Sequence, residues 1–164
     1  MLVLQLQLAQ FLGVRSNKLA SWTELGDAEA KRFSGTALYT INFNKPADKA
    51  DDWVLDLGCV RESARVRING QHVGTLFSVP FSIAVGQFLV EGKNVLEVEV
   101  TNLMANRIAD MDRRKVLWKK FDTTPSFCDI HWKEFDASNW PPMDSGLLGP
   151  VCLIPSRFIE YGAK

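Results

Sequence analysis

Apolar residues occupy every second position in two runs of the chain, at 64–68 and at 96–100. Successive side chains of a β-strand point to opposite faces of a sheet, so each run has one apolar face and one polar face. A third, shorter alternation covers 81–85. Together these runs predict consecutive strands of an antiparallel sheet that has one face in contact with water.

An Asn-Gly pair at 69–70 follows the first of these runs. A type I′ turn needs positive φ at both central residues, and Asn-Gly between two alternating segments is therefore a strong hairpin signal. Pairing Ile68 with Gln71 across this turn predicts that Val66 lies opposite Val73. Both valines then face the apolar side of the sheet, as a core on one side requires.

Strand signals also occur on either side of this region. Residues 37–43 place aromatic and aliphatic side chains on one face, 53–58 end at a glycine, and 151–154 are predicted to form the last strand. Residues 1–14 also alternate; they lack the positive start and the clear cleavage site of a signal peptide, so we interpret them as a strand. We expect a loop or a short helix at 17–32.

The alternation stops after residue 102. Residues 103–147 contain three of the five tryptophans, three of the seven prolines and a charged cluster at 112–115. A structureless connection of this length is uncommon inside a compact domain. The segment is therefore expected either to contain short elements or to form a functional loop.

Composition narrows the class of protein. A chain of 164 residues suits one domain, and 46% hydrophobic and 23% charged residues are ordinary for a globular protein. Nineteen basic residues balance nineteen acidic ones, which argues against a nucleic-acid partner because such binding rests on basic surface. No apolar run is long enough to cross a bilayer, so no membrane partner is expected.

The cysteines are Cys59, Cys128 and Cys152, and none belongs to a Cys-x-x-Cys pair. An odd count excludes a complete set of disulfides within one chain, and the spacing gives no support for a zinc site or a redox motif. We expect free thiols, and a single disulfide stays open as the alternative. Cysteine content therefore leaves the cellular compartment undecided.

Several ordered motifs resemble the sugar-binding β-sandwich module of family 2 glycoside hydrolases and their relatives. The motifs are Val66 and Ile68 leading into Asn-Gly at 69–70, Val-Gly at 73–74, Pro-Phe at 80–81, Gly-Lys-Asn at 92–94, and a Val/Leu-rich run at 95–100 that leads to Asn102. The resemblance implies a galactose-binding-domain-like fold.

Five further pieces resemble the C-terminal β-sandwich module of large bacterial glycosidases related to the family 106 α-L-rhamnosidases, which are often labelled β-galactosidase-like. They are Ser-Trp-Thr at 21–23, Phe-Ser-Gly-Thr-Ala-Leu-Tyr at 33–39, Leu-Asp-Leu-Gly at 55–58, Thr-Asn-Leu at 101–103 with Asn-Arg at 106–107, and Ser-Gly-Leu-Leu-Gly-Pro-Val at 145–151. The sequence departs from that pattern at Ile-Ala-Asp, residues 108–110, where a glycine is expected before the aspartate.

The expected fold is an all-β, jelly-roll-like sandwich of two antiparallel sheets, galactose-binding-domain-like, over residues 18–155. Residues 1–17 are expected to be an N-terminal strand or the remnant of an upstream region, and 156–164 a C-terminal tail. The resemblance implies a catalytic domain of the same polypeptide as a partner, because catalytic residues of the resembled enzymes lie in a separate domain. A polysaccharide-degrading enzyme of that kind would be secreted or periplasmic.

Carbohydrate is the ligand that the resemblance and the residue types favour. Aromatic rings pack on the C–H faces of sugars, and amide, guanidinium and carboxylate groups bind hydroxyls. The candidate carbohydrate-binding residues lie in the segment without strand pattern. They are Asn106, Arg107, Asp110, Trp118, Trp132 and Trp140. The alternative for the same residues is structural packing of a long loop onto the sandwich.

Evidence for catalysis is weaker. Glycoside hydrolysis usually needs two carboxyl groups about 5 to 10 Å apart, and no spacing in the sequence pairs two of them. His72 and His131 lack a nucleophile elbow, so no catalytic residue is assigned. Asp129, His131 and Glu134 lack a second His or a Cys pair, so no metal site and no cofactor is assigned. A structural calcium ion, held mainly by backbone carbonyls, stays open.

These observations predict a non-catalytic carbohydrate-binding or accessory module of a bacterial glycoside hydrolase that acts on polysaccharide. Two alternatives stay open. One is a structural scaffold that docks a catalytic domain and binds no sugar. The other is a small glycosidase in its own right, which would need a carboxylate pair in the segment after residue 102.

Overall fold

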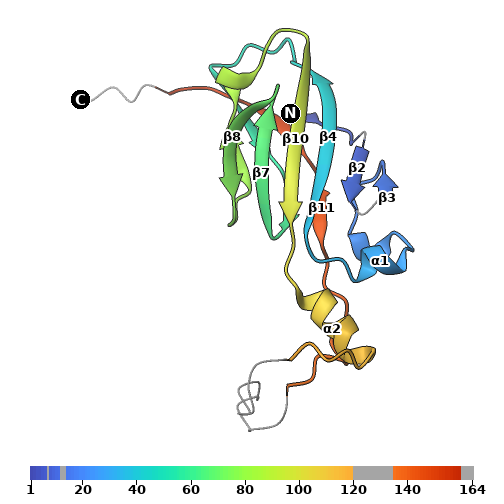
Figure 1. Cartoon of the computed structure of the whole chain (residues 1–164). Coiled ribbons are helices and arrows are strands. Elements are labelled where there is room, and N and C mark those ends of the chain that lie inside the picture. The colour runs from blue at the N-terminus through green and yellow to red at the C-terminus, as the bar shows by residue number, and fades with distance from the viewer. Residues whose placement is uncertain (7, 12–13, 120–134, 160–164) are drawn as a thin grey trace, which may run out of the picture.

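The computed structural model describes residues 1–6, 8–11, 14–119 and 135–159 (Figure 1). The helical elements are η1 (Trp22–Glu24), α1 (Ala28–Lys31), η2 (Gly86–Phe88) and α2 (Ala105–Arg113). The strands are β1 (Leu2–Val3), β2 (Leu8–Phe11), β3 (Val14–Ser16), β4 (Thr36–Asn44), β5 (Asp52–Asp56), β6 (Cys59–Arg61), β7 (Ser63–Ile68), β8 (Gln71–Leu76), β9 (Ser82–Ala84), β10 (Lys93–Thr101), β11 (Gly146–Gly149) and β12 (Cys152–Ser156).

The strands form two main sheets. One has six strands in the order β3-β2-β4-β10-β7-β8, and the other has four in the order β1-β12-β5-β9. A short ribbon of β11 and β6 joins them, and the named strands of the described chain all pair antiparallel. The predicted all-β antiparallel sandwich is confirmed.

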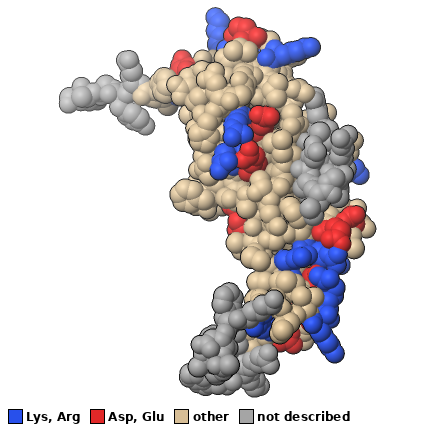
Figure 2. All heavy atoms as spheres, in the orientation of Figure 1, with Lys and Arg blue, Asp and Glu red and all other residues tan. Residues whose placement is uncertain are grey.

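The hydrophobic core lies between the two sheets. Leu96, Val98 and Val100 of β10 are fully buried, as the alternation predicted, and Leu55 of β5 packs into the same cluster. On the outer face of the six-stranded sheet, Figure 2 shows basic and acidic side chains meeting. Surface pairs of this kind stabilise little, so the buried apolar face dominates the stability of the sandwich.

The predicted hairpin is present, but its register differs from the predicted one. Asn69 has a φ of 52° and Gly70 a φ of 78°, and Ile68 pairs with Gln71 as expected. The next core residue, Val66, lies opposite Gly74, because the register shifts by one residue at a β-bulge in β8. The prediction that Val66 lies opposite Val73 is therefore wrong.

Two glycines explain how the ribbon of β5 and β12 continues into β6 and β11. Gly58 and Gly149 bridge each other where the strands bend. Gly58 has a φ of +64°, and a Cβ there would lie 2.6 Å from the carbonyl carbon of Gly149. Only glycine allows the two backbones to approach so closely.

Residues before position 17 contribute strands to both sheets. Strand β1 pairs with β12 in the four-stranded sheet, and β2 pairs with β4 in the six-stranded sheet. The alternating pattern that predicted a strand here is thus explained by two short strands and a third, β3, that extends the sheet edge. This part of the chain is continuous with the sandwich.

An arm extends from one end of the sandwich, below β10 in Figure 1. We define the arm as residues 103–119 and 135–145, with α2 at its base and the returning chain beside that helix. A hydrogen bond of 2.8 Å from the Ala137 N–H to the Asp112 carboxylate joins the two halves. In the described part of the chain no helix has the length and apolar character needed to cross a bilayer.

Candidate functional site

A group of buried polar side chains joins the arm to the sandwich. Asn102 donates to the Ser145 hydroxyl at 3.0 Å, and Asn106 donates to the same oxygen at 3.3 Å. The Ser145 N–H in turn donates to the Ser21 hydroxyl at 3.1 Å. We call these residues, Ser21, Asn102, Asn106 and Ser145, the neck. Because each is less than a tenth exposed, their hydrogen bonds fix the direction in which the arm leaves the sandwich.

Asn106, one of the candidate sugar-binding residues, uses both ends of its amide inside the fold. Its Nδ2 donates to the Met143 carbonyl at 2.7 Å, and its Oδ1 accepts from the Met143 N–H at 2.8 Å. The residue is 6% exposed. This geometry favours the structural alternative for Asn106, since ligand hydroxyls would have to compete with backbone groups.

Asp110 and Arg107 lie on the same helix as Asn106. The Asp110 carboxylate pairs with Arg114 at 2.7 Å and faces Arg32 of the α1 region at 3.7 Å. With Asn106 it lines a small hollow of about 210 Å³ between the two helices. Arg107 does not line this hollow, and no described residue makes a hydrogen bond or ion pair with its side chain.

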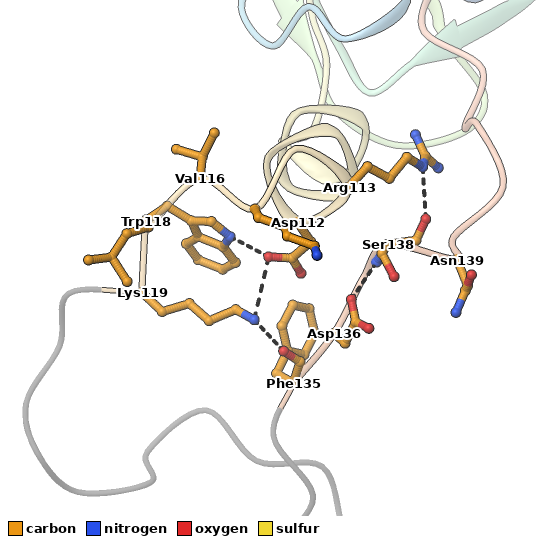
Figure 3. A pocket seen from close by; sticks show the side chains of 11 residues that line it. Asp112, Arg113, Val116, Trp118, Lys119, Phe135, Asp136, Ser138 and Asn139 are labelled. Atoms are coloured by element: carbon orange, nitrogen blue, oxygen red, sulfur yellow. Dashed lines mark hydrogen bonds and ion pairs between the residues drawn. The ribbon is translucent and has the colours of Figure 1, made fainter.

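A larger hollow lies at the far end of α2 (Figure 3). It has a volume of about 840 Å³ and is lined on one side by residues 115–119 and on the other by residues 135, 136, 138 and 139, together with Asp112 and Arg113 of α2. We call it the arm hollow. Trp118 and Phe135 supply its aromatic surface, and Lys115, Asp136 and Asn139 supply polar groups.

Aromatic contacts hold the walls of the arm hollow together. Trp118 and Phe135 meet edge to face with ring centroids 6.3 Å apart, and Phe135 meets Trp140 in the same way at 5.5 Å. The Lys119 Nζ lies 5.5 Å from the Trp118 ring and 5.4 Å from the Phe135 ring. Edge-to-face pairs and cation–π contacts favour one relative orientation of the rings.

Asp112 lies at the base of the arm hollow. Its Oδ1 accepts from the Trp118 Nε1–H at 2.6 Å and faces the Lys119 Nζ at 3.4 Å. Its Oδ2 accepts from the Ala137 N–H at 2.8 Å. Burial raises the pKa of this carboxyl, but the hydrogen bonds from Ala137 and Trp118 and the charge of Lys119 outweigh burial and hold the pKa below its ordinary value.

The six candidate residues thus do not form one site. Trp118 lines the arm hollow. Trp140, which is 41% exposed, does not line it but contacts the Phe135 ring edge to face. Asn106 and Asp110 belong to the smaller hollow, and Arg107 to neither. The sixth candidate, Trp132, lies outside the described residues.

Sequence reasoning missed three groups in the arm hollow. Phe135 could have been found from its aromatic character alone, because it lies in the segment already singled out for its tryptophans. Asp112 stood in the sequence as part of a charged cluster and as one of several carboxylates that no spacing paired, and Lys119 carried no signal. Their roles depend on contacts between positions that only the folded chain brings together.

No group of three or more His, Cys, Asp or Glu residues that could hold a metal ion occurs among the described residues. The structural calcium ion stays an open alternative. Cys59 and Cys152 are free thiols, as predicted, and Cys128 lies outside the described residues. Asp110 and Asp112, two of the arm carboxylates, both accept hydrogen bonds inside the fold, and the glycosidase stays an alternative.

Known proteins contain regions that are similar to this chain. No protein-family model matches the chain. A protein of Formosa agariphila named "Putative beta-glucuronidase" is 34% identical over 157 residues, which cover 84% of this chain and 13% of that protein. The solved rhamnosidase of Novosphingobium sp. PP1Y matches with a TM-score of 0.70 and 26% identity, over 92% of this chain and 14% of the rhamnosidase chain.

The chain is similar to one small part of larger glycoside hydrolases. A beta-D-glucuronidase of Dictyoglomus thermophilum shares the fold, with a TM-score of 0.53 and 20% identity over 60% of this chain and 19% of that enzyme. All three relatives are much longer than the matched region. The predicted resemblance to a module of glycoside hydrolases is confirmed at this level.

Proposed function

We propose that the chain is a non-catalytic accessory module of a glycoside hydrolase and that the arm hollow binds carbohydrate. The observation that carries the proposal is the arm hollow itself, with Trp118 and Phe135 beside polar side chains. Aromatic rings next to a few polar groups are the usual lining of a small-molecule site. The similarity to parts of glycoside hydrolases makes a saccharide the natural ligand for such a lining.

Chemically, the arm hollow offers both kinds of contact that a sugar needs. The rings present apolar surface for C–H faces. The Lys115 amine and the Asn139 amide have no hydrogen-bond partner among the described residues, so they are available to hydroxyls. Asp136 is engaged by Ser138, whose N–H donates to one carboxylate oxygen at 2.8 Å and whose side chain also bonds to the carboxylate.

The proposal extends to the polypeptide in which the module works. We infer that the module works beside a catalytic domain of the same polypeptide, in the manner of the C-terminal module of family 106-like enzymes. The sugars to try first follow from the named relatives, which are a rhamnosidase and glucuronidases. A secreted or periplasmic location belongs to the same proposal.

Titration of the chain with a panel of rhamnose- and glucuronic-acid-containing mono- and oligosaccharides tests sugar binding. Calorimetry should detect binding by the wild type, and Trp118→Ala should weaken it about tenfold or more, because an aromatic anchor is lost. Phe77→Ala is the matched control. Phe77 is a 79% exposed aromatic residue that lines a different hollow, so its loss should leave affinity unchanged.

Absence of binding by the wild type across the panel at millimolar ligand would sink the sugar-binding proposal. Equal losses in Trp118→Ala and Phe77→Ala would place the binding site somewhere other than the arm hollow.

One observation favours a second candidate, the docking scaffold. Phe77 and Val79, in the loop between β8 and β9, are 79% and 81% exposed. Contiguous exposed apolar surface marks contact sites in proteins, and these two residues lie two positions apart in one loop. A scaffold should bind no sugar and should co-elute with the catalytic domain of its own polypeptide when the two are produced separately. Failure to co-elute, with sugar binding intact, would exclude this candidate.

A further inference from the structure

We propose that Asp112 is the positioning residue of the arm hollow, because its carboxylate joins the two walls and sets the orientation of the Trp118 ring. The proposal rests on the proposed function in calling the hollow a sugar site. The placement of Trp118 by Asp112, however, can be measured without any sugar.

Both walls of the arm hollow reach the same carboxylate. From one wall come the Trp118 Nε1–H at 2.6 Å and the Lys119 Nζ at 3.4 Å (Figure 3). From the other wall comes the Ala137 N–H at 2.8 Å. Lys119 also donates to the Phe135 carbonyl, which closes a second link between the walls. Ala137 is fully buried, so water could replace the carboxylate only at a cost.

The Asp112 carboxylate is itself well anchored. Asp112 lies in the last turn of α2, and its side chain is only 7% exposed. The first turn of the same helix is tied to the sandwich through the neck, where Asn106 and Asn102 donate to the same Ser145 hydroxyl. A continuous chain of contacts therefore leads from the sandwich through α2 to the Trp118 ring. A binding group held in this way loses little freedom when a ligand arrives.

A purely stabilising role of Asp112 and a positioning role predict different results for an Asp112 variant. If Asp112 only stabilised the arm, its replacement would lower the melting temperature and leave the Trp118 ring in place whenever the arm is folded. If it positions Trp118, the indole N–H must change its environment, and sugar affinity must fall, in protein that remains folded. The test therefore needs a folded variant and a readout specific to Trp118.

Asp112→Asn is the main variant, because it keeps the size of the side chain and one carbonyl acceptor. It removes the charge opposite Lys119 and leaves either Trp118 or Ala137 without an acceptor. Asp144→Asn is the matched control, since it removes an exposed carboxylate of the arm that does not line the arm hollow. Lys119→Gln is the second variant, because it weakens the link between the walls while the Trp118–Asp112 bond can still form.

The sugar-free readout is the indole N–H region of a ¹H–¹⁵N spectrum, where the five tryptophans give separate signals and Trp118→Ala assigns one of them. We expect the Trp118 signal to move and to exchange faster with solvent in Asp112→Asn, while the Trp22 and Trp53 signals stay in place. The Trp118 signal should stay in place in Asp144→Asn and shift only slightly in Lys119→Gln. An unchanged Trp118 signal in folded Asp112→Asn overturns the proposal.

The sugar readout uses whichever saccharide the wild type binds. Affinity should fall about tenfold in Asp112→Asn and stay within about twofold of the wild type in Asp144→Asn. Full affinity in Asp112→Asn, with a loss in Trp118→Ala, also overturns the proposal. If the wild type binds no sugar while the Trp118 signal responds as expected, the positioning role stands and the proposed function fails.

Discussion

The sandwich and the arm are stabilised in different ways. Between the sheets, residues such as Leu96, Val98 and Ile41 are fully buried and apolar. In the arm, α2 and the returning chain are joined by directional bonds to backbone groups, from Asn106 to Met143 and from Asp112 to Ala137. Arg113 adds a bond to the Ser138 carbonyl at 2.8 Å.

The difference has a consequence for function. Hydrophobic burial stabilises any arrangement that removes apolar surface from water, so it builds a scaffold without fixing each atom. Hydrogen bonds fix distances and directions, and an unmatched buried partner is costly. A site that must hold a ring and polar groups at set positions is therefore better supported by the bonding seen in the arm. The two regions should therefore respond differently to substitution and to pH.

The largest expected effect is in the sandwich. Leu96→Ala removes a fully buried side chain from the middle of β10 and leaves a cavity between the sheets. We expect the free energy of unfolding to fall by about 2 to 5 kcal/mol. Urea unfolding followed by circular dichroism measures it. Val95→Ala is the control, because that side chain on the same strand is 39% exposed and should cost far less.

The strands of the sandwich could be predicted because their signal is local. Period-two alternation in β4 and β10 needs only neighbouring residues, and the turn at 69–70 is set by its own backbone. The bulge in β8 was not predictable, because alternation alone does not show where an extra residue will be accommodated. Gly74 faces Ile83 there, and a Cβ would lie 2.6 Å from its Cδ1.

The arm was harder to predict for two physical reasons. Helix α2 starts after Met104, which provides no side-chain cap, so the usual Ser, Thr, Asp or Asn signal for a helix start is missing. The arm hollow depends on contacts across a long separation, such as Asp112 with Ala137, 25 residues apart. Residue type alone identified Trp118, and nothing in the sequence connected it to its carboxylate partner.

A smaller effect is expected at the neck. Ser145→Ala removes the hydroxyl that accepts from Asn102 and Asn106. The side-chain amide of each asparagine then loses one hydrogen-bond acceptor. We expect a loss of about 1 to 3 kcal/mol. The arm should respond more than the sandwich, because its direction depends on these bonds. Amide hydrogen exchange checks this, with faster exchange in α2 than in β10 as the expected result and equal acceleration in both as the contrary one.

The subtlest difference lies in the response to pH. Burial raises the pKa of Tyr39, inside the sandwich, above its ordinary value of 10.0, even though the Leu147 N–H and the Trp22 N–H both donate to its oxygen. Stability from this group is present below the ordinary pKa and is lost as pH rises through the higher folded value. The pKa of Asp112 in the arm lies below its ordinary value of 3.8. Its contribution is present above that ordinary value and is lost as pH falls through the folded one.

The two regions should therefore weaken at opposite ends of the pH scale. The groups facing Asp112 are Lys119 at 3.4 Å and, further away, Asp136, and Lys119 keeps its charge throughout the acid range. Melting temperatures measured from acid to alkaline pH check the expectation. The advantage of the wild type over Asp112→Asn should shrink in acid, and its advantage over Tyr39→Phe should shrink in alkali. If both variants lose their difference from the wild type at the same end, the arm and the sandwich do not differ in the way that their hydrogen bonds and burial imply.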